Sequence, residues 1–125
     1  DINEECTSIA RKYFDKSKYS KNIKPHIGNA IDIIPKLNTN FQLAFIDADK
    51  ENYSLYFDLI IDKIDEGGYI IADNVLWSGK VLNEKKDIET KALDDYNRKL
   101  VTDKRVETIL LPVRDGLMVS RKIRK

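Results

Sequence analysis

Hydrophobic residues recur at helical spacing in several parts of the chain. The pattern predicts helices over residues 3–16, 53–64 and 88–100. The middle helix has the most regular spacing, with apolar side chains three or four positions apart throughout, and Gly67-Gly68 is expected to end it. Its apolar residues are Tyr53, Tyr56, Phe57, Ile60, Ile61 and Ile64.

Short apolar runs between these helices predict strands. Residues 41–46 are almost continuously apolar, which is typical of a strand covered on both faces in a parallel sheet. Residues 69–72 form the next buried strand. Residues 23–27 predict a weaker one, because Pro25 cannot donate a hydrogen bond to a neighbouring strand. A turn at Gly28-Asn29 should then lead into a helix that runs to about residue 37.

The last third of the chain predicts two strands, over residues 105–111 and 117–123. The turn between them contains Asp115-Gly116, directly before apolar residues, which is a hairpin signal. We therefore expect these two strands to be antiparallel. Residues 17–22 and 75–87 lack a regular period and are expected to be loops.

Helices and strands thus alternate along the chain until the final hairpin. Such alternation implies right-handed βαβ units and a parallel sheet with helices on both faces. The predicted fold class is α/β, a Rossmann-like, doubly wound and mostly parallel sheet with a C-terminal antiparallel strand. At 125 residues the chain is one domain or a part of one.

Composition and charge limit the partners and the cellular compartment that we expect for the protein. The formal net charge of +1 provides no field that selects nucleic acid or a membrane, and no apolar run approaches the roughly 20 residues of a membrane span. A single cysteine, Cys6, excludes an internal disulfide, so we expect a reducing, cytoplasmic setting. The polar start at Asp1, without an initiator Met or a leader, leads us to expect that upstream sequence is missing.

Polar side chains follow two of the predicted buried strands. Asp47 comes directly after the strand at 41–46, and Asp73-Asn74 follows the strand at 69–72. Because ligands bind beyond the carboxyl ends of strands in such sheets, these oxygens are expected to converge. Oxygen ligands favour Mg²⁺, Mn²⁺ or Ca²⁺ over zinc. The alternative is that these residues form ordinary Asx turns after strands.

These residues belong to a longer series of short motifs. In order they are Phe45-Ile46-Asp47-Ala48-Asp49-Lys50-x-x-Tyr53, Gly67-Gly68, Asp73-Asn74-x-x-Trp77-x-Gly79 and Leu111-Pro112-x-x-Asp115-Gly116-Leu117. The combination resembles the cation-dependent class I O-methyltransferases, which include the caffeoyl-CoA and catechol O-methyltransferases. The resemblance runs over nearly the whole chain and implies methyl transfer from S-adenosylmethionine.

The chain departs from that family at its start. The family opens with a strand and a glycine-rich turn that grips the methionine part of the cofactor. The five glycines here form no such turn near residue 1. By the resemblance, Asp1 falls at the acidic residue that holds the cofactor ribose at the end of the second strand. Residues 1–125 therefore resemble the C-terminal portion of a single methyltransferase domain, truncated at the N-terminus.

The resemblance also assigns roles around the strand ends. The resemblance implies that a divalent cation, with Mg²⁺ as the first choice, is held by Asp47, Asp73 and Asn74. Because the cation takes part in the reaction, Asp47 also counts as a catalytic residue. Lys50 is implied to be the general base, with a pKa lowered by the cation and by partial burial. The alternative for Lys50 is a solvated side chain at a helix N-terminus.

Further residues are implied to bind the cofactor and the acceptor. Asp1 would hold the ribose, the segment Gly28, Asn29 and Ala30 would line the adenine edge, and Asp49 would lie on the cofactor side of its loop. The alternatives are an ordinary strand-to-helix turn at Gly28 and helix capping at Asp49. Trp77 is implied to wall the acceptor pocket.

The expected function is metal-dependent methyl transfer to a hydroxyl oxygen of a catechol-like or other vicinal-oxygen small molecule, by a homodimer. One alternative is methylation of a hydroxylated base in tRNA. The chain ends in the basic residues Arg121, Lys122, Arg124 and Lys125, but we interpret these as a solvated terminus and not as an RNA contact. Another alternative is an inactive metal-binding or interaction fragment. A third is a different α/β enzyme, such as one that binds a nucleotide.

Overall fold

The computed structural model describes residues 1–123 and divides into two compact units. The first contains residues 1–37 and the second begins at Asn38. Each unit is described by itself. The expected basic end falls partly outside this description, because Arg124 and Lys125 are not among the described residues.

Helix α1 of the first unit spans Glu4–Lys16, so the helix predicted over 3–16 is confirmed. The side chain of Asn3 caps it by accepting a hydrogen bond from the backbone N–H of Cys6. A short 3₁₀ helix, η1, follows at Ser20–Asn22, within the segment predicted to be a loop.

The strand predicted over residues 23–27 is wrong, since these residues pair with no strand in the described chain. Pro25 lacks the N–H that a ladder requires, which removes one of the few bonds that so short a segment would make. The helix predicted after it is divided into α2, Ala30–Ile33, and the 3₁₀ helix η2, Ile34–Lys36. Pro35 lies at this division, because it cannot donate to the helical hydrogen-bond ladder.

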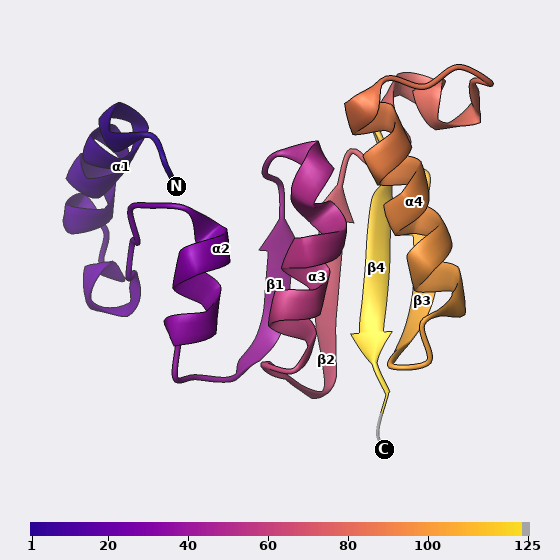
Figure 1. Ribbon diagram of the computed structural model, residues 1–125. Helices are drawn as coiled ribbons and strands as arrows, with labels where there is room; N and C mark the ends of the chain where they lie inside the picture. Colours follow the sequence, from indigo (N-terminus) through magenta and orange to yellow (C-terminus); the bar gives the residue numbers. More distant parts are fainter. Residues whose placement is uncertain (124–125) are drawn as a thin grey trace. The chain divides into compact units, whose positions relative to one another are not determined.

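The second unit is built on a four-stranded sheet (Figure 1). Its strands are β1 (Phe41–Ile46), β2 (Ile64–Asp73), β3 (Val106–Leu111) and β4 (Leu117–Lys122). The spatial order is β1-β2-β4-β3, with β1 parallel to β2 and β4 antiparallel to both of its neighbours. Three strands therefore share one direction, and the C-terminal strand is antiparallel as predicted.

Strand β2 starts earlier than the sequence pattern predicts. It begins at Ile64, and Gly67-Gly68 lie inside it instead of ending the preceding helix, which already stops at Ile61. The pairing register with β1 shifts here, from Phe41 opposite Ile64 to Leu43 opposite Tyr69. Glycine is needed at position 68 because a Cβ there would lie 2.8 Å from the backbone oxygen of Gln42.

Helices α3 (Tyr53–Ile61) and α4 (Ile88–Thr102) lie on the same face of the sheet (Figure 1). The predicted apolar face of α3 is buried. Helix α4 buries Leu93, Tyr96 and Leu100, while its first residue, Ile88, is exposed. The two helices meet through aromatic side chains, with the ring of Tyr96 edge-on to both Tyr53 and Phe57. This layer holds the core of the unit and fixes the start of α3, where the candidate site lies.

The opposite face of the sheet carries a row of apolar side chains, one from each strand. The register places Phe45 opposite Ile71, Ile71 opposite Val119, and Val119 opposite Ile109. The outer members Phe45 and Ile109 are 57% and 59% exposed. Apolar patches of this kind usually mark a surface that another element or partner covers.

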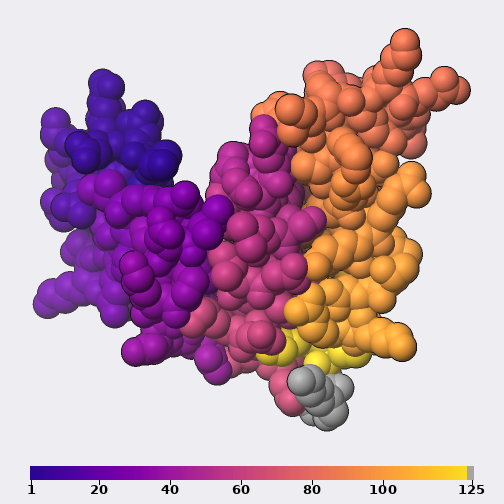
Figure 2. Space-filling view, in the orientation of Figure 1, coloured from indigo at the N-terminus to yellow at the C-terminus, as the bar shows by residue number. Residues whose placement is uncertain are grey.

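The segment predicted as a loop over 75–87 contains the 3₁₀ helix η4, Trp77–Leu82. Residues beyond it project from the second unit (Figure 2), and the flanking side chains of Leu82 and Ile88 are exposed. None of the helices among residues 1–123 has the length and apolar character that a membrane crossing requires.

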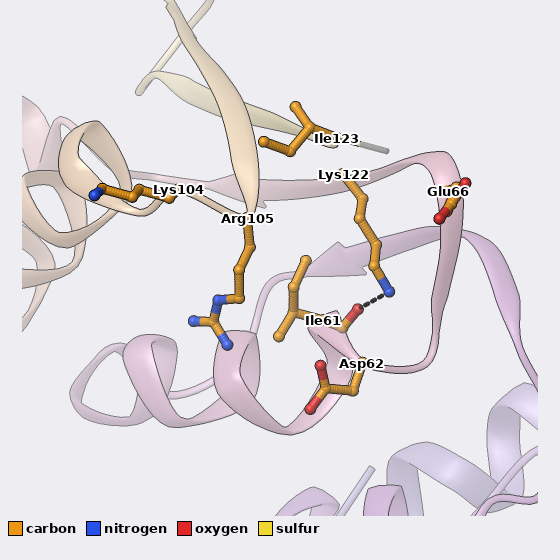
Figure 3. Close-up of a pocket in the computed structure, with 7 residues that line it drawn as sticks. All are labelled: Ile61, Asp62, Glu66, Lys104, Arg105, Lys122 and Ile123. Atoms are coloured by element: carbon orange, nitrogen blue, oxygen red, sulfur yellow. Dashed lines mark hydrogen bonds between the residues drawn. The ribbon is translucent and has the colours of Figure 1, made fainter. Parts of the chain in front are cut away.

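A hollow of about 600 Å³ opens where β4 ends and β3 begins (Figure 3). Lys122 lies in it and donates from Nζ to the backbone oxygens of Ile61, at 2.9 Å, and Ile64, at 2.7 Å. The basic residue thus binds the last carbonyl of α3 and the first carbonyl of β2. This is the end of the sheet opposite the carboxyl ends of β1 and β2.

Candidate functional site

Asp47 and Asp73 lie at the carboxyl ends of two neighbouring strands. Strands β1 and β2 are parallel, and Ile46 is paired with Ala72 at their carboxyl ends. The next residue of each strand is therefore an aspartate at the same edge. The register therefore brings the two aspartates to adjacent strand ends, since neighbouring strands lie only about 4.8 Å apart.

In the described part of the chain, Lys50 contacts two of the three predicted ligands, Asp47 and Asn74, but not Asp73. Its Nζ donates to Asp47 Oδ1 at 3.0 Å, to Asn74 Oδ1 at 3.0 Å and to the hydroxyl of Tyr53 at 2.7 Å. The lysine is only 8% exposed, and its Nζ lies 5.6 Å from the centre of the Trp77 ring. The alternative of a solvated lysine is therefore wrong, and the ammonium lies among oxygens contributed by both strand ends.

The expected lowering of the Lys50 pKa is not found in the protein alone. Burial by itself would lower this pKa, but the hydrogen bonds to Tyr53 and Asp47 and the nearby carboxylate charge outweigh burial. The net pKa of Lys50 is raised above its ordinary value. These contacts therefore favour the ammonium form of Lys50.

Tyr53 holds the lysine in place. Its side chain is fully buried at the first position of α3, and its hydroxyl donates to the backbone oxygen of Asp73 at 2.9 Å. The same hydroxyl accepts from Lys50, so one oxygen links the lysine to the end of β2. Burial raises the pKa of Tyr53, more than the neighbouring ammonium lowers it, which keeps the phenol protonated as a donor.

Asn74 opens a loop with unusual backbone geometry. Asn74, Trp77 and Ser78 all have positive φ, at 63°, 48° and 53°. Residues other than glycine adopt this region at a cost and only where the surroundings impose it. The backbone N–H of Asn74 donates to Asp73 Oδ1 at 2.7 Å, which ties the two predicted ligands to each other.

Asp49 lies on the other side of the same loop. It occupies the position before the 3₁₀ helix η3, Lys50–Asn52, but its side chain makes no capping hydrogen bond there, so the capping alternative is wrong. Its carboxylate instead accepts from the hydroxyl of Tyr56 and the amide of Asn52. Burial raises the pKa of Asp49, yet these bonds outweigh it and the net pKa is lowered. Burial, together with the hydrogen bond to the charged Asp49, raises the pKa of Tyr56 to about 12.

The residues expected to bind the cofactor ribose and adenine lie together in the first unit. The backbone N–H of Gly28 donates to the backbone oxygen of Asp1 at 2.9 Å, and the N-terminal amine of Asp1 donates to the backbone oxygen of His26 at 2.9 Å. Asn29 caps α2 by accepting from the N–H of Ile31, so an ordinary turn accounts for part of this segment. Ala30 is the first residue of that helix.

The ligand set at the strand ends suits a hard cation. Among the described residues no three His, Cys, Asp or Glu side chains form a metal cluster, and one of the three predicted ligands is an amide. The set is two carboxylates and one amide oxygen, and two of these oxygens already hold an ammonium. Such all-oxygen sites favour Mg²⁺, Mn²⁺ or Ca²⁺.

Two residues of this site had no assigned role in the sequence. Tyr53 was expected only to pack in the core, and Asp115 only to form the hairpin turn. The spacing of three between Lys50 and Tyr53 was a usable signal, since such residues share a helical face. The contact of Asp115 with Asn74 joins positions 41 residues apart, and no local pattern indicates it.

The sequence of this chain is similar to those of known O-methyltransferases. A family model described as O-methyltransferase matches residues 1–123. A Dictyostelium discoideum relative named "Probable caffeoyl-CoA O-methyltransferase 2" is 35% identical over 130 aligned positions, which cover 98% of this chain and 56% of the relative. Caffeoyl-CoA O-methyltransferase 5 of Nicotiana tabacum is 32% identical over 136 positions, covering 98% and 57%.

Solved structures share the fold. The SAH-bound methyltransferase PaMTH1 of Podospora anserina has a TM-score of 0.89 and 27% identity, over 99% of this chain and 59% of that one. The predicted α/β fold is confirmed by this similarity. The chain spans little more than half the length of the relatives that it matches.

Proposed function

The chain belongs to the O-methyltransferase family whose model it matches, and on this basis we propose that the whole protein transfers a methyl group from S-adenosylmethionine to a hydroxyl oxygen. The proposed acceptor is a small molecule with two neighbouring oxygens, as in a catechol. The observation that carries this proposal is the position of Lys50, whose ammonium lies 3.0 Å from both Asp47 and Asn74 at the strand ends. An acceptor there would meet a proton-transfer group and a cation-binding set at once.

Asp47, Asp73 and Asn74 are proposed to hold a divalent cation, with Mg²⁺ first and Mn²⁺ or Ca²⁺ as alternatives. Support comes from the oxygen-only ligand set and from the strand register that brings its members to one edge. When bound, the cation supplies positive charge that lowers the pKa of nearby acidic groups, including an acceptor hydroxyl.

Several residues are proposed to contact the cofactor. Asp1 would bind the ribose hydroxyls, Gly28, Asn29 and Ala30 would border the adenine, and Asp49 would face the cofactor. The backbone contact between Asp1 and Gly28 supports treating the residues of the first unit as one group. Trp77 is proposed to line the acceptor pocket, because its ring lies within reach of the Lys50 ammonium.

The proposed reaction is a direct displacement. The acceptor oxygen forms a bond to the methyl carbon as the bond from that carbon to the sulfonium sulfur breaks, leaving the neutral thioether. Lys50, in its neutral form, takes the proton from the acceptor hydroxyl at Nζ. Holding the two reactants in line provides much of the acceleration, since orientation alone can supply roughly 7–11 kcal/mol.

A labelled-methyl assay tests this proposal in the full-length protein. Label should pass from S-adenosylmethionine to a catechol panel, and not to compounds whose hydroxyl has no neighbouring oxygen. Label in bulk tRNA and none in the catechols would instead support the tRNA alternative. Absence of transfer together with absence of cofactor binding in calorimetry would support the binding-module alternative.

A further inference from the structure

Asp115 contacts the side chain of Asn74 from the turn between β3 and β4. Its Oδ2 lies 3.3 Å from Asn74 Nδ2, while Asn74 Oδ1 lies 3.0 Å from the ammonium of Lys50. A carboxylate only accepts hydrogen bonds and an ammonium only donates them. The two neighbours therefore fix the orientation of the amide, with the oxygen of Asn74 turned toward the Lys50 ammonium and its NH₂ toward Asp115.

The same turn also supports the backbone of the loop that begins at Asn74. Asp115 Oδ1 accepts from the N–H of Ser78 at 2.6 Å, and the backbone oxygen of Asp115 accepts from the N–H of Leu76 at 2.9 Å. Gly116 allows this close approach, since a Cβ there would lie 2.6 Å from Leu76 Cγ. One carboxylate thus fixes both the strained loop and the amide.

We propose that Asp115 is a positioning residue of the cation site: it holds the Asn74 amide so that Oδ1 faces the position of a divalent cation. This inference rests on the proposed function, because it requires that Asn74 is a ligand. Asp115 itself accepts only from Asn74, Leu76 and Ser78 in the described structure, so it acts through Asn74 and the loop. Partners of metal ligands commonly affect affinity by about 10–100-fold.

The substitution Asp115→Asn separates the two duties of this carboxylate. The new amide has one oxygen and one NH₂ group. If its oxygen accepts from Ser78, its NH₂ faces the NH₂ of Asn74, and two donors oppose each other. Asn74 can then relieve the clash only by turning its own NH₂ toward the cation site. The loop contact survives, while the ligand orientation is lost.

The double variant Asn74→Asp/Asp115→Asn exchanges the donor and the acceptor between positions 74 and 115. It should restore the hydrogen bond between these two side chains. The amide introduced at position 115 is then the donor, its NH₂ facing one oxygen of the carboxylate at position 74, and its own oxygen still accepts from Ser78. The second oxygen at position 74 faces the cation site. A role confined to loop stability predicts no such repair, because the Ser78 contact is the same in both variants.

Titration calorimetry with Mn²⁺ alone, on the full-length protein, tests the inference, with thermal unfolding of each variant measured in parallel. Asp115→Asn should bind Mn²⁺ about tenfold or more weakly, and the double variant should bind at least as tightly as the unmodified protein. The matched control is Asp87→Asn, where the carboxylate also accepts a backbone N–H, from Thr90, and binding should not change.

Three results would overturn the inference. One is Mn²⁺ binding by Asp115→Asn within twofold of the unmodified protein. Another is a double variant that binds no better than Asp115→Asn while unfolding at the same temperature. The third is an unmodified protein that binds no Mn²⁺, which would overturn the proposed cation site as well, whereas the first two leave that site intact.

Discussion

The ammonium of Lys50 and the side-chain oxygen of Asn74 lie 3.0 Å apart, although the two residues are 24 positions apart in the chain. The parallel pairing of β1 and β2 makes this contact, because both residues follow strand ends at one edge of the sheet. An ammonium held by oxygens indicates a place where positive charge is favoured.

Asp47→Ala in the full-length protein should abolish methyl transfer. The substitution removes one of two carboxylates proposed to hold the cation, and an excess of chelator should have the same effect on the unmodified protein. Restored Mg²⁺ should recover activity in the unmodified protein only. Asp62→Ala, at the opposite end of the sheet, is the control and should behave as the unmodified protein does. Full turnover in excess chelator would contradict the metal role.

Lys50→Met should lower turnover by about 10²–10⁴-fold, the usual contribution of a positioned proton-transfer group. Mn²⁺ affinity should not weaken, because the substitution removes an ammonium that holds two of the same oxygens. Steady-state kinetics and calorimetry give the two quantities. Lys91→Met serves as the control, since Lys91 pairs with Asp95 on the surface of α4. Turnover within a few-fold of normal would show that another group is the base.

Tyr53→Phe should destabilise the protein by about 1–3 kcal/mol, because it removes the hydroxyl that donates to the Asp73 carbonyl and takes away one of the three oxygen partners of the Lys50 ammonium. Urea unfolding measures the change. Tyr96→Phe is a matched control in the same core: the Tyr96 hydroxyl is buried and has no hydrogen-bond partner among the described residues. Removing it should leave the free energy of unfolding unchanged or slightly higher. Equal losses in both variants would rule out a specific role for the Tyr53 hydroxyl.

Acid should weaken the second unit through the ion pairs of Arg105. Hydrogen bonds from Arg105 lower the pKa of Asp103, and bonds from Lys99 and Arg105 lower that of Asp58 despite its partial burial. Both folded pKa values lie below the unfolded ones. The stabilisation is therefore complete above the ordinary aspartate pKa of about 3.9 and is lost as the pH falls through the lowered values.

The unfolding free energy measured from pH 6 downward checks this expectation. The contribution of each pair should stay below about 1 kcal/mol, since Asp58 and Arg105 are partly exposed. Arg105→Met should flatten the acid dependence, whereas Arg11→Met removes the same charge from the first unit and should leave it as it was. An identical acid profile in Arg105→Met and the unmodified protein would exclude these pairs as its cause.

Residues 1–125 in isolation should self-associate through the apolar row on the exposed sheet face. Phe45 and Ile109 each leave more than half of their side chain in water, which favours contact between such faces. Sedimentation velocity over a range of concentrations measures the association, and Phe45→Lys should reduce it. Leu82→Lys, at an exposed position away from the sheet, is the control. A monomer at all concentrations would contradict the expectation.

The sequence alone determined much of the fold of this protein. Hydrophobic periods are properties of neighbouring residues, so α1, α3, α4 and the hairpin of β3 and β4 were predicted within a few positions. The strand ends at Asp47 and Asp73 were also evident, because an apolar run that stops at an aspartate is a local signal. The positions of these residues at one edge followed from the parallel sheet that the alternation of elements predicted.

Tertiary structure decided what depends on partners distant in the chain. The strand expected at 23–27 has no neighbour to pair with among the described residues, and Gly67-Gly68 entered β2 because backbone from β1 approaches Gly68 closely. The pKa of Lys50 rose because Tyr53 and Asp47 both reach its ammonium. Asp115 met Asn74 across 41 residues. Hydrogen bonds of this kind depend on side-chain direction and packing, which the order of residues alone does not specify.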